Sequence, residues 1–342
     1  MLFFGDGSGR VFRRNDTGTI FNGSTRPPFY SFHAEFALLR DRLLSAALLI
    51  SAALLLIWLD HQYPLFQTRG LWLVPLLFGF TFGTTLDVTR LLIASGRAVD
   101  RRSVALTTLM VAFSAYIPVV WTLTGEVYPA DCPIGRKGWV VIAAVAAIFI
   151  ILGREMLRYD ASKRGAALER TLGGAFVSCY VGIPMAALVL IRDLGDSGWG
   201  LAALITMIAA TKSADAGAYF SGKAIGRHKL IPHLSPGKTW EGAIGGVATS
   251  IGVSYLCFFK LIPAMAESST AGPIWGPVVF GTICAFAGMV GDLAESLVKR
   301  ETGVKDSGRT LPGLGGVWDV TDSLIAAVVP AWVALAAGIA GM

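Results

Sequence analysis

Two stretches of the chain combine acidic, basic and glycine residues at the edges of long apolar runs, residues 212–242 and residues 291–322. In the second stretch, Asp292 and Asp319 each adjoin an apolar run. A carboxylate in such a place is costly unless it faces a polar cavity or a partner. Ligand sets made only of oxygen favour magnesium over zinc. The pattern therefore predicts that Asp292 and Asp319 hold a magnesium ion.

The same residues also suit a purely structural role. Glu295 and Lys299 have the i,i+4 spacing of an ion pair on one helix face. Asp319 and Asp322 would cap the start of the next helix. Capping alone does not explain why both stretches also concentrate Lys, Arg and Gly, as a phosphate site does. We therefore expect metal binding in addition to capping.

Basic side chains accompany the carboxylates in both stretches: Lys223, Arg227, Lys229, Lys238, Lys299, Arg300, Lys305 and Arg309. Transfer of a polyphosphate group needs cations around the phosphates and a divalent metal that neutralises developing charge. A Walker motif is absent, because Pro232 stands where the upstream glycine would fall. The basic residues could simply mark a cytoplasmic side, but that does not explain the interleaved Asp and Gly. We favour a site for a phosphate-bearing ligand.

Membrane helices must position these residues, because 54% of the 342 residues are hydrophobic and only 15% are charged. Soluble proteins carry about 25% charged residues. A net charge of +6 is then expected to reflect topology rather than nucleic-acid binding, and no nucleic-acid motif is present. The four cysteines are far apart in the sequence, which predicts free thiols rather than disulfides or a metal site.

Nine apolar runs are candidates for spanning helices, since a span needs about 20 mostly apolar residues. They cover residues 43–59, 71–93, 103–123, 138–153, 171–191, 198–212, 241–260, 273–291 and 320–340. We therefore predict an all-α integral membrane protein with nine transmembrane helices. Residues 1–38 are expected to form a flexible cytoplasmic tail without strands, residues 39–211 helices 1–6, and residues 212–342 the catalytic region. Asp87 and Arg90, inside the second run, would either pair with each other or face the polar cavity.

Basic residues give this bundle an orientation, because Lys and Arg accumulate in cytoplasmic connections. With the N-terminus in the cytoplasm, all but five of the 29 Lys and Arg residues fall on the cytoplasmic side. The exceptions are Arg69, Arg136, Lys137, Arg192 and Lys260. Both charged stretches then face the cytoplasm.

The second stretch resembles the signature of the phosphatidate cytidylyltransferases, or CDP-diacylglycerol synthases. The matching positions are Ser296, Lys299, Arg300, Lys305, Asp306, Gly308, Leu311, Pro312, Gly315, Gly316, Asp319 and Asp322. The first stretch is similar to the other cytoplasmic block of this family through Asp215, Gly222, Arg227, Pro232 and the run from Ser235 to Gly242. Leu314 stands where the family has His, and Val320 where it has Arg or Gln.

The resemblance implies a CTP-dependent reaction in which phosphatidic acid attacks the α-phosphorus of CTP, giving CDP-diacylglycerol and pyrophosphate. It also implies a multi-pass protein of the inner membrane with a cytoplasmic active site. Asp292 and Asp319 would hold magnesium, with Asp322 behind them or on a second cation. The residues expected to act on the reacting phosphates are Ser296, Lys299, Arg300, Lys305 and Asp306. Those expected to shape the nucleotide side are Asp215, Arg227, Ser235, Lys238 and Glu241.

Other functions remain open at this point. A CTP-dependent polyprenol or phytol kinase, or a cytidylyltransferase for an ether lipid, would keep the metal and change the lipid. An anion transporter would also use charges inside the membrane, but it predicts inverted repeats, which the sequence lacks. Gly242, Gly245, Gly246 and Gly252 would suit either a homodimer interface or packing within one chain.

Overall fold

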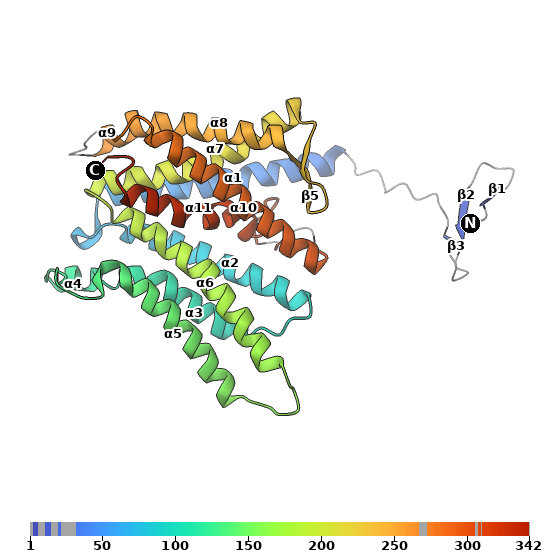
Figure 1. Cartoon of the computed structure of the whole chain (residues 1–342), viewed down its shortest axis with the longest axis horizontal. Coiled ribbons are helices and arrows are strands. Elements are labelled where there is room, and N and C mark those ends of the chain that lie inside the picture. The colour runs from blue at the N-terminus through green and yellow to red at the C-terminus, as the bar shows by residue number, and fades with distance from the viewer. Residues whose placement is uncertain are drawn as a thin grey trace.

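Helices build almost all of the protein in the computed structural model, which describes residues 3–5, 11–14, 20–21, 32–266, 272–304, 307–308 and 310–341 (Figure 1). The helices are α1 (Phe32–Gln62), α2 (Val74–Ala94), α3 (Arg101–Phe113), α4 (Val119–Leu123), α5 (Gly135–Leu157), α6 (Ala166–Arg192), α7 (Ser197–Ile225), α8 (Trp240–Leu256), α9 (Ile262–Met265), α10 (Gly276–Thr302) and α11 (Trp318–Ala336). Short 3₁₀ turns η1 (Leu65–Gln67), η2 (Leu71–Leu73) and η3 (Ser114–Tyr116) and a π turn η4 (Cys257–Leu261) join them.

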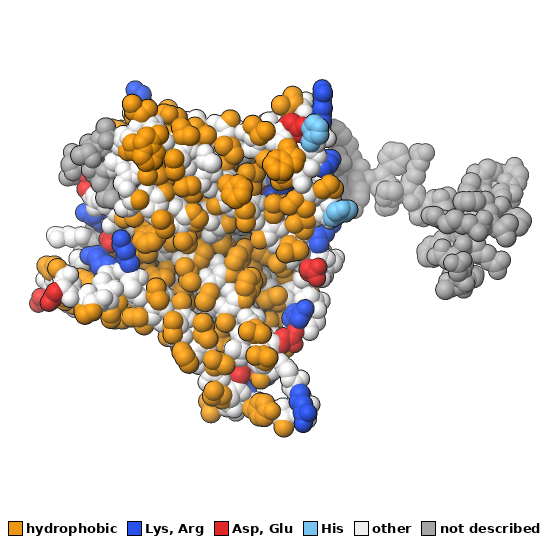
Figure 2. Space-filling model, in the orientation of Figure 1, with side chains coloured by type: hydrophobic (Ala, Val, Ile, Leu, Met, Phe, Trp, Pro, Cys, Tyr) orange, Lys and Arg blue, Asp and Glu red, His pale blue; other side chains and the backbone are white. Residues whose placement is uncertain are grey.

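Seven helices among the described residues are long and apolar enough to cross a membrane: α1, α2, α5, α6, α8 with its continuation to Met265, α10 and α11. Hydrophobic side chains cover the middle of the face seen in Figure 2, whereas Lys, Arg, Asp and Glu gather towards its two ends. This distribution is the one expected of a protein that lies across a bilayer. The protein is therefore an all-α membrane protein, as predicted.

The other two predicted spans differ from the expectation in form. Residues 103–123 were expected as one helix, but this segment is divided into α3, η3 and α4. Residues 198–212 were expected as a short span, but α7 continues to Ile225. The first charged stretch is therefore helical up to Ile225 and becomes a hairpin only after it. Asp215 and Lys223, which follow the apolar run on the same helix, line a cleft beside it.

Side chains of the connecting residues mark where several helices begin. The carboxylate of Asp196 accepts a hydrogen bond from Trp199 N (2.6 Å) at the start of α7. Thr239 Oγ1 accepts one from Gly242 N (3.1 Å) at the start of α8. Such N-caps satisfy backbone N–H groups that the helix cannot pair itself. Before α8, strands β4 (Lys229–Ile231) and β5 (Ser235–Thr239) pair as an antiparallel hairpin.

Small residues bring α7 and α8 close together. A Cβ atom on Gly242 would lie 2.8 Å from Ala218 O, and one on Gly246 would lie 2.8 Å from Ala214 O. Gly245 packs against Ser221 in the same interface, whereas Gly252 has no atom within 4 Å of a Cβ position. Three of the four glycines considered for a dimer interface therefore serve packing within the chain.

The N-terminal residues include a small sheet that the sequence pattern does not predict. β1 (Phe3–Gly5), β2 (Val11–Arg14) and β3 (Ile20–Phe21) pair antiparallel in the order β1-β2-β3. Helix α1 then begins at Phe32, before the expected end of the tail at residue 38. The expectation of a tail without strands is therefore wrong for these three segments.

Candidate active site

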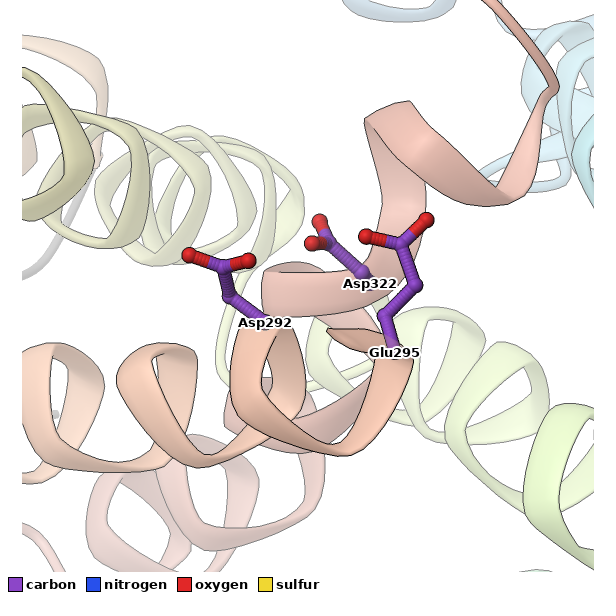
Figure 3. A group of neighbouring side chains, drawn as sticks. All are labelled: Asp292, Glu295 and Asp322. Atoms are coloured by element: carbon purple, nitrogen blue, oxygen red, sulfur yellow. The ribbon is translucent and has the colours of Figure 1, made fainter. Parts of the chain in front are cut away.

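Three carboxylates from two adjacent helices form the centre of the site. Asp292 and Glu295 come from α10 and Asp322 comes from α11, and one oxygen of each lies within 4.8 Å of the others. Figure 3 shows Asp292 and Glu295 pointing from one face of α10 towards Asp322. Glu295 and Asp322 are buried, whereas the side chain of Asp292 is 40% exposed. The i,i+3 spacing of Asp292 and Glu295 places both on the same helix face.

Glycine lets α10 and α11 approach closely enough for these carboxylates to meet. A Cβ atom on Gly291 would lie 2.8 Å from the Cβ of Ala326 and even closer to Asp322 O. Gly291 is buried and directly precedes Asp292. Because Gly291 allows the close approach, the next residue, Asp292, is held near α11.

Asp319 lies in a neighbouring arrangement around Lys299 and not in the group of three carboxylates. Lys299 Nζ forms ion pairs with Glu295 Oε1 (2.9 Å) and with Asp319 Oδ1. Asp319 Oδ2 accepts hydrogen bonds from Ser307 Oγ (2.8 Å) and Gly316 N (2.5 Å). Both oxygens of Asp319 are thus engaged, so it holds Lys299 and the glycine-rich loop before α11.

Basic side chains from other elements reach the same carboxylates. Lys238, at the end of β5, forms an ion pair with Asp292 (2.7 Å). Lys212 on α7 donates to Ser323 Oγ (2.8 Å), which in turn donates to Asp215 Oδ2 (3.0 Å). Four elements, α7, β5, α10 and α11, therefore meet at one set of alternating charges.

A polar cleft opens beside this set of charges. It has a volume of about 420 Å³ and lies between α7, the β4–β5 hairpin, α8 and α10. Its lining includes Asp215, Lys223, Ser235, Lys238 and Asp292. Anionic groups that enter the cleft from solution would therefore meet two lysines and two carboxylates.

An apolar groove of about 590 Å³ adjoins the cleft on the outer surface of α8 and α10. Trp240, Ala248 and Phe286 are among its lining residues. Leu230 and Met289 line both spaces. A ligand with a polar head and an apolar chain can therefore lie across the junction.

Hydrogen bonds hold the β4–β5 hairpin to the start of α8, and the loop before α11 to α1. Glu241 accepts hydrogen bonds from the backbone N–H groups of Arg227 (3.1 Å) and His228 (3.2 Å), and its carboxylate lies 2.6 Å from His228 Nδ1. Arg42 Nε donates to Gly313 O (2.7 Å) and Ser45 Oγ to Pro312 O (2.8 Å). The start of α1 therefore braces the loop that contains Leu314, where the family signature has His.

The remaining predicted residues divide into three groups. Arg300 reaches the hairpin through Leu234 O (3.4 Å), whereas Ser296 is half-buried on α10 with no hydrogen bond to another described residue. Asp215 and Ser235 line the cleft, as stated above, and Arg227 contributes its backbone to Glu241. Lys305 and Asp306, together with Arg309, lie outside the described residues.

Sequence reasoning missed part of the site. Glu295 has the i+3 spacing that places it on one helix face with Asp292, but the ligands predicted from the sequence are Asp292 and Asp319. Lys212 was not singled out as a contact of the site, and Ser323 lies inside an apolar run, so its type gave no signal. Their importance follows only from the packing of α7 against α11.

Comparison with known proteins agrees with this site. A sequence model of the cytidylyltransferase family matches residues 40–337. The chain is 43% identical over 199 residues to a phosphatidate cytidylyltransferase of Brucella suis biovar 1 (strain 1330), which covers 55% of this chain and 68% of that protein. It is 42% identical over 135 residues to the phosphatidate cytidylyltransferase of Haemophilus influenzae, 39% of this chain and 45% of that protein. Because the family match extends over nearly the whole bundle and both charged stretches, the chain belongs to the cytidylyltransferase family.

Proposed function

We infer that the protein transfers the cytidylyl group of CTP to phosphatidic acid, which gives CDP-diacylglycerol and pyrophosphate. The observation that carries this function is a polar cleft that is lined by Lys238 and by Asp292, one of the three carboxylates, and that adjoins an apolar groove. A water-soluble nucleotide and a lipid need such a junction. The similarity to phosphatidate cytidylyltransferases supports the same reaction.

Magnesium fits the residues of this site. The donors Asp292, Glu295 and Asp322 offer only oxygen, which suits a hard cation. Glu295 Oε1 is buried and pairs with the Lys299 ammonium (2.9 Å), which shows that this position accommodates a positive charge. One oxygen of Glu295 lies within 4.8 Å of oxygens of Asp292 and Asp322, so the three carboxylates could share one cation. We propose these three residues as the magnesium ligands, in place of a pair made of Asp292 and Asp319.

The chemistry requires positioning and charge rather than a protein nucleophile. The phosphate monoester of phosphatidic acid is an anion at neutral pH and is already a nucleophile. One of its oxygens forms a bond to the α-phosphorus of CTP while the bond to the β-phosphate breaks, and pyrophosphate leaves. Bound magnesium would neutralise charge on the nucleotide phosphates.

The protein's own residues would hold the two substrates in line. Lys238 and Lys223 are the cleft cations that would meet the nucleotide phosphates. Lys299, fixed between Glu295 and Asp319, would place a positive charge beside the carboxylates without freedom to move away. Prepositioned charges of this kind stabilise the transition state because they need no reorganisation during the reaction.

We propose that the apolar groove between α8 and α10 receives an acyl chain of phosphatidic acid. Its lining is almost entirely apolar, and it faces outward, where lipid would surround the bundle. The phosphate head would then lie at the Leu230–Met289 junction with the polar cleft.

We propose nine crossings of a bacterial inner membrane, with the N-terminus and the active site on the cytoplasmic side. Supporting this, α7 has 29 residues, and α3, η3 and α4 together extend from Arg101 to Leu123. Helices that follow one another in the chain run in alternating directions in Figure 1 when these two segments are counted. Arg42 and Ser45 contact the loop before α11, which supports placing the N-terminal part of α1 and the site on the same side of the membrane. A homodimer remains a prediction.

The test is magnesium-dependent release of pyrophosphate by purified protein given phosphatidic acid and labelled CTP. We expect CDP-diacylglycerol from the wild type. Asp292→Asn and Asp322→Asn should raise the magnesium concentration that gives half-maximal activity, while Asp319→Asn should lower kcat with little change in that concentration. Turnover of a polyprenol or an isoprenoid ether lipid in place of phosphatidic acid would contradict the proposed substrate. A raised magnesium requirement in Asp319→Asn alone would contradict the ligand assignment.

A further inference from the structure

Asp87 is a buried carboxylate on α2 that belongs neither to the polar cleft nor to the three carboxylates. Its side chain is 0% exposed, in the interior of an apolar helix bundle. Oδ2 accepts hydrogen bonds from Val317 N (2.6 Å) and Trp318 N (3.2 Å), and Oδ1 lies 3.6 Å from the guanidinium of Arg90. Burial of a charge is costly, so its retention calls for an explanation.

The start of α11 explains what Asp87 does locally. The N-cap of α11 is Val317, whose side chain cannot accept a hydrogen bond from the first turn. The first N–H groups of a helix need acceptors, and a negative charge near them is favourable. Asp87, which precedes Val317 by 230 residues in the chain, supplies both the acceptor and the negative charge.

The fit between α2 and this turn is tight on several sides. A Cβ atom on Gly316 would lie 2.5 Å from Asp87 Oδ2, and one on Gly83 would overlap the side chain of Val317. One turn into α11, Thr321 Oγ1 is hydrogen-bonded to Thr84 Oγ1 (2.9 Å). The first turn of α11 therefore has little freedom to shift or rotate while Asp87 is in place.

The residues held in this way carry the site. Gly316, whose N–H donates to Asp319, directly precedes the two residues that Asp87 binds. Asp322 lies one turn further along α11 and belongs to the three carboxylates. We propose that Asp87 is a positioning residue for nucleotidyl transfer, which fixes the first turn of α11 and thereby Asp319 and Asp322. This inference rests on the proposed function.

A second buried carboxylate provides a matched control. Asp60 is also 0% exposed, accepts a backbone hydrogen bond from Gly70 N (2.8 Å), and pairs with an arginine, Arg192 (2.7 Å). Asp60 lies near the C-terminal end of α1, and Arg192 is the last residue of α6. Both lie next to the residues that precede α2, at the other end of the bundle from the site (Figure 1). Loss of either carboxylate should destabilise the fold by a similar mechanism, but only Asp87 contacts α11.

The experiment compares Asp87→Asn with Asp60→Asn in the complete protein. For each variant we would measure the melting temperature, kcat, the KM values for CTP and phosphatidic acid, and the magnesium concentration for half-maximal activity. A readout without turnover is the rise in melting temperature caused by magnesium with CTP in the absence of phosphatidic acid, since a ligand that binds the folded state stabilises it.

We expect Asp87→Asn to lower kcat about tenfold or more and to raise the magnesium requirement several-fold, because a shift of about 1 Å in a positioned group is costly. Its KM for phosphatidic acid should stay within about threefold, since α8 and α10 form the groove. The ligand-induced rise in melting temperature should shrink. Asp60→Asn should melt at a lower temperature but keep kcat within about threefold of the wild type, with the full ligand-induced rise.

Two outcomes would overturn the proposal: wild-type kcat and magnesium dependence in Asp87→Asn, or the same kinetic changes in both variants. If Asp87→Asn does not fold, Arg90→Gln tests the same link, because the half-exposed Arg90 only balances the charge of Asp87. Arg90→Gln should then change kcat in the same direction by a smaller factor, and unchanged kinetics would reject the idea. Failure of the proposed function is distinguishable, since the wild type itself would then make no CDP-diacylglycerol.

Discussion

At the scale of single residues, carboxylates of the same type have different tasks because of their surroundings. Asp319 has a lysine and three hydrogen-bond donors around it. Glu295 is equally enclosed and pairs with the same Lys299, but one of its oxygens lies within 4.8 Å of oxygens of Asp292 and Asp322. An oxygen that already accepts several hydrogen bonds is a poor candidate for a cation ligand, whereas one that lies beside two further carboxylates is suited to one.

Glu295→Gln tests this difference. The amide keeps the size of the side chain but removes the charge, so we expect magnesium-dependent release of pyrophosphate to fall about 10- to 100-fold. Glu301→Gln, near the exposed end of the same helix, is the control and should keep at least about half of the activity. Near wild-type activity in Glu295→Gln would remove Glu295 from the proposed ligands.

At the scale of elements, a charged cluster fastens the N-terminal end of α3 to the C-terminal end of α5. Asp100 caps α3 by accepting from Arg102 N (3.3 Å) and also binds Ser103 Oγ (2.7 Å). Its carboxylate forms ion pairs with Arg154 (3.1 Å) and Arg158 (2.9 Å). Partial burial by itself would raise the pKa of Asp100, but the hydrogen bond from Ser103 and the two arginines hold this pKa below its ordinary value of 3.8.

The lowered pKa of Asp100 predicts how stability depends on pH. Because the folded state binds the proton less tightly than the unfolded state, Asp100 stabilises the fold fully above pH about 4. That contribution is lost as the pH falls through the lowered pKa. Asp100→Asn should therefore cost roughly 1 kcal/mol at neutral pH and reduce the loss of stability in acid.

This effect can be measured as the melting temperatures of wild type and Asp100→Asn at pH values from 3 to 7, spaced about one unit apart. Wild type and Asp100→Asn should differ most at neutral pH and converge in acid. A constant difference between them at every pH would show that the charge of Asp100 contributes nothing. Activity at neutral pH is the control, because this cluster does not contact the polar cleft.

At the scale of the whole molecule, the reaction depends on a polar cleft and a lipid-facing groove that meet at one place. α8 and α10 line both spaces, so one pair of helices relates the nucleotide side to the lipid side. Ala248 lies on α8 within the groove, beyond the junction with the cleft. A bulky side chain at this position should fill the groove without reaching the carboxylates.

Ala248→Trp should therefore raise the KM for long-chain phosphatidic acid about tenfold and that for a short-chain analogue much less. The KM for CTP should stay within about twofold. Val145→Trp on the exposed face of α5 is the control for a tryptophan added to the outer surface. Equal KM values for long chains in both variants would exclude this groove as the acyl site.

The number of crossings can be tested with a cysteine in place of Ser162, between α5 and α6. With nine crossings this residue faces the cytoplasm, whereas omission of α3 and α7 as crossings would place it outside. We expect no labelling of intact cells by a membrane-impermeant thiol reagent, and labelling after the membrane is opened. The cysteine is introduced into a Cys132→Ser variant, so that Cys132 gives no label. A cysteine in place of Ser95, which is cytoplasmic in both topologies, is the control. Labelling of intact cells at residue 162 would rule out nine crossings.

The membrane class, most helix positions and the two charged stretches follow from the order of residues along the chain. These properties are local, because a run of apolar residues must form a helix in lipid whatever surrounds it. The signature around Ser296–Asp322 likewise indicated the family from consecutive residues. The sequence was less reliable for α7, because Lys212 and Asp215 interrupt the apolar run although the helix continues past them.

Which side chains meet depends instead on how the helices pack. Asp322 joins Asp292 and Glu295 because glycines let α10 and α11 pack closely, while Asp319, one turn before Asp322, points to Lys299 instead. Asp87 acts on α11 across 230 residues of chain. Such contacts depend on how helices distant in sequence cross one another, and residue types along one helix do not carry that information.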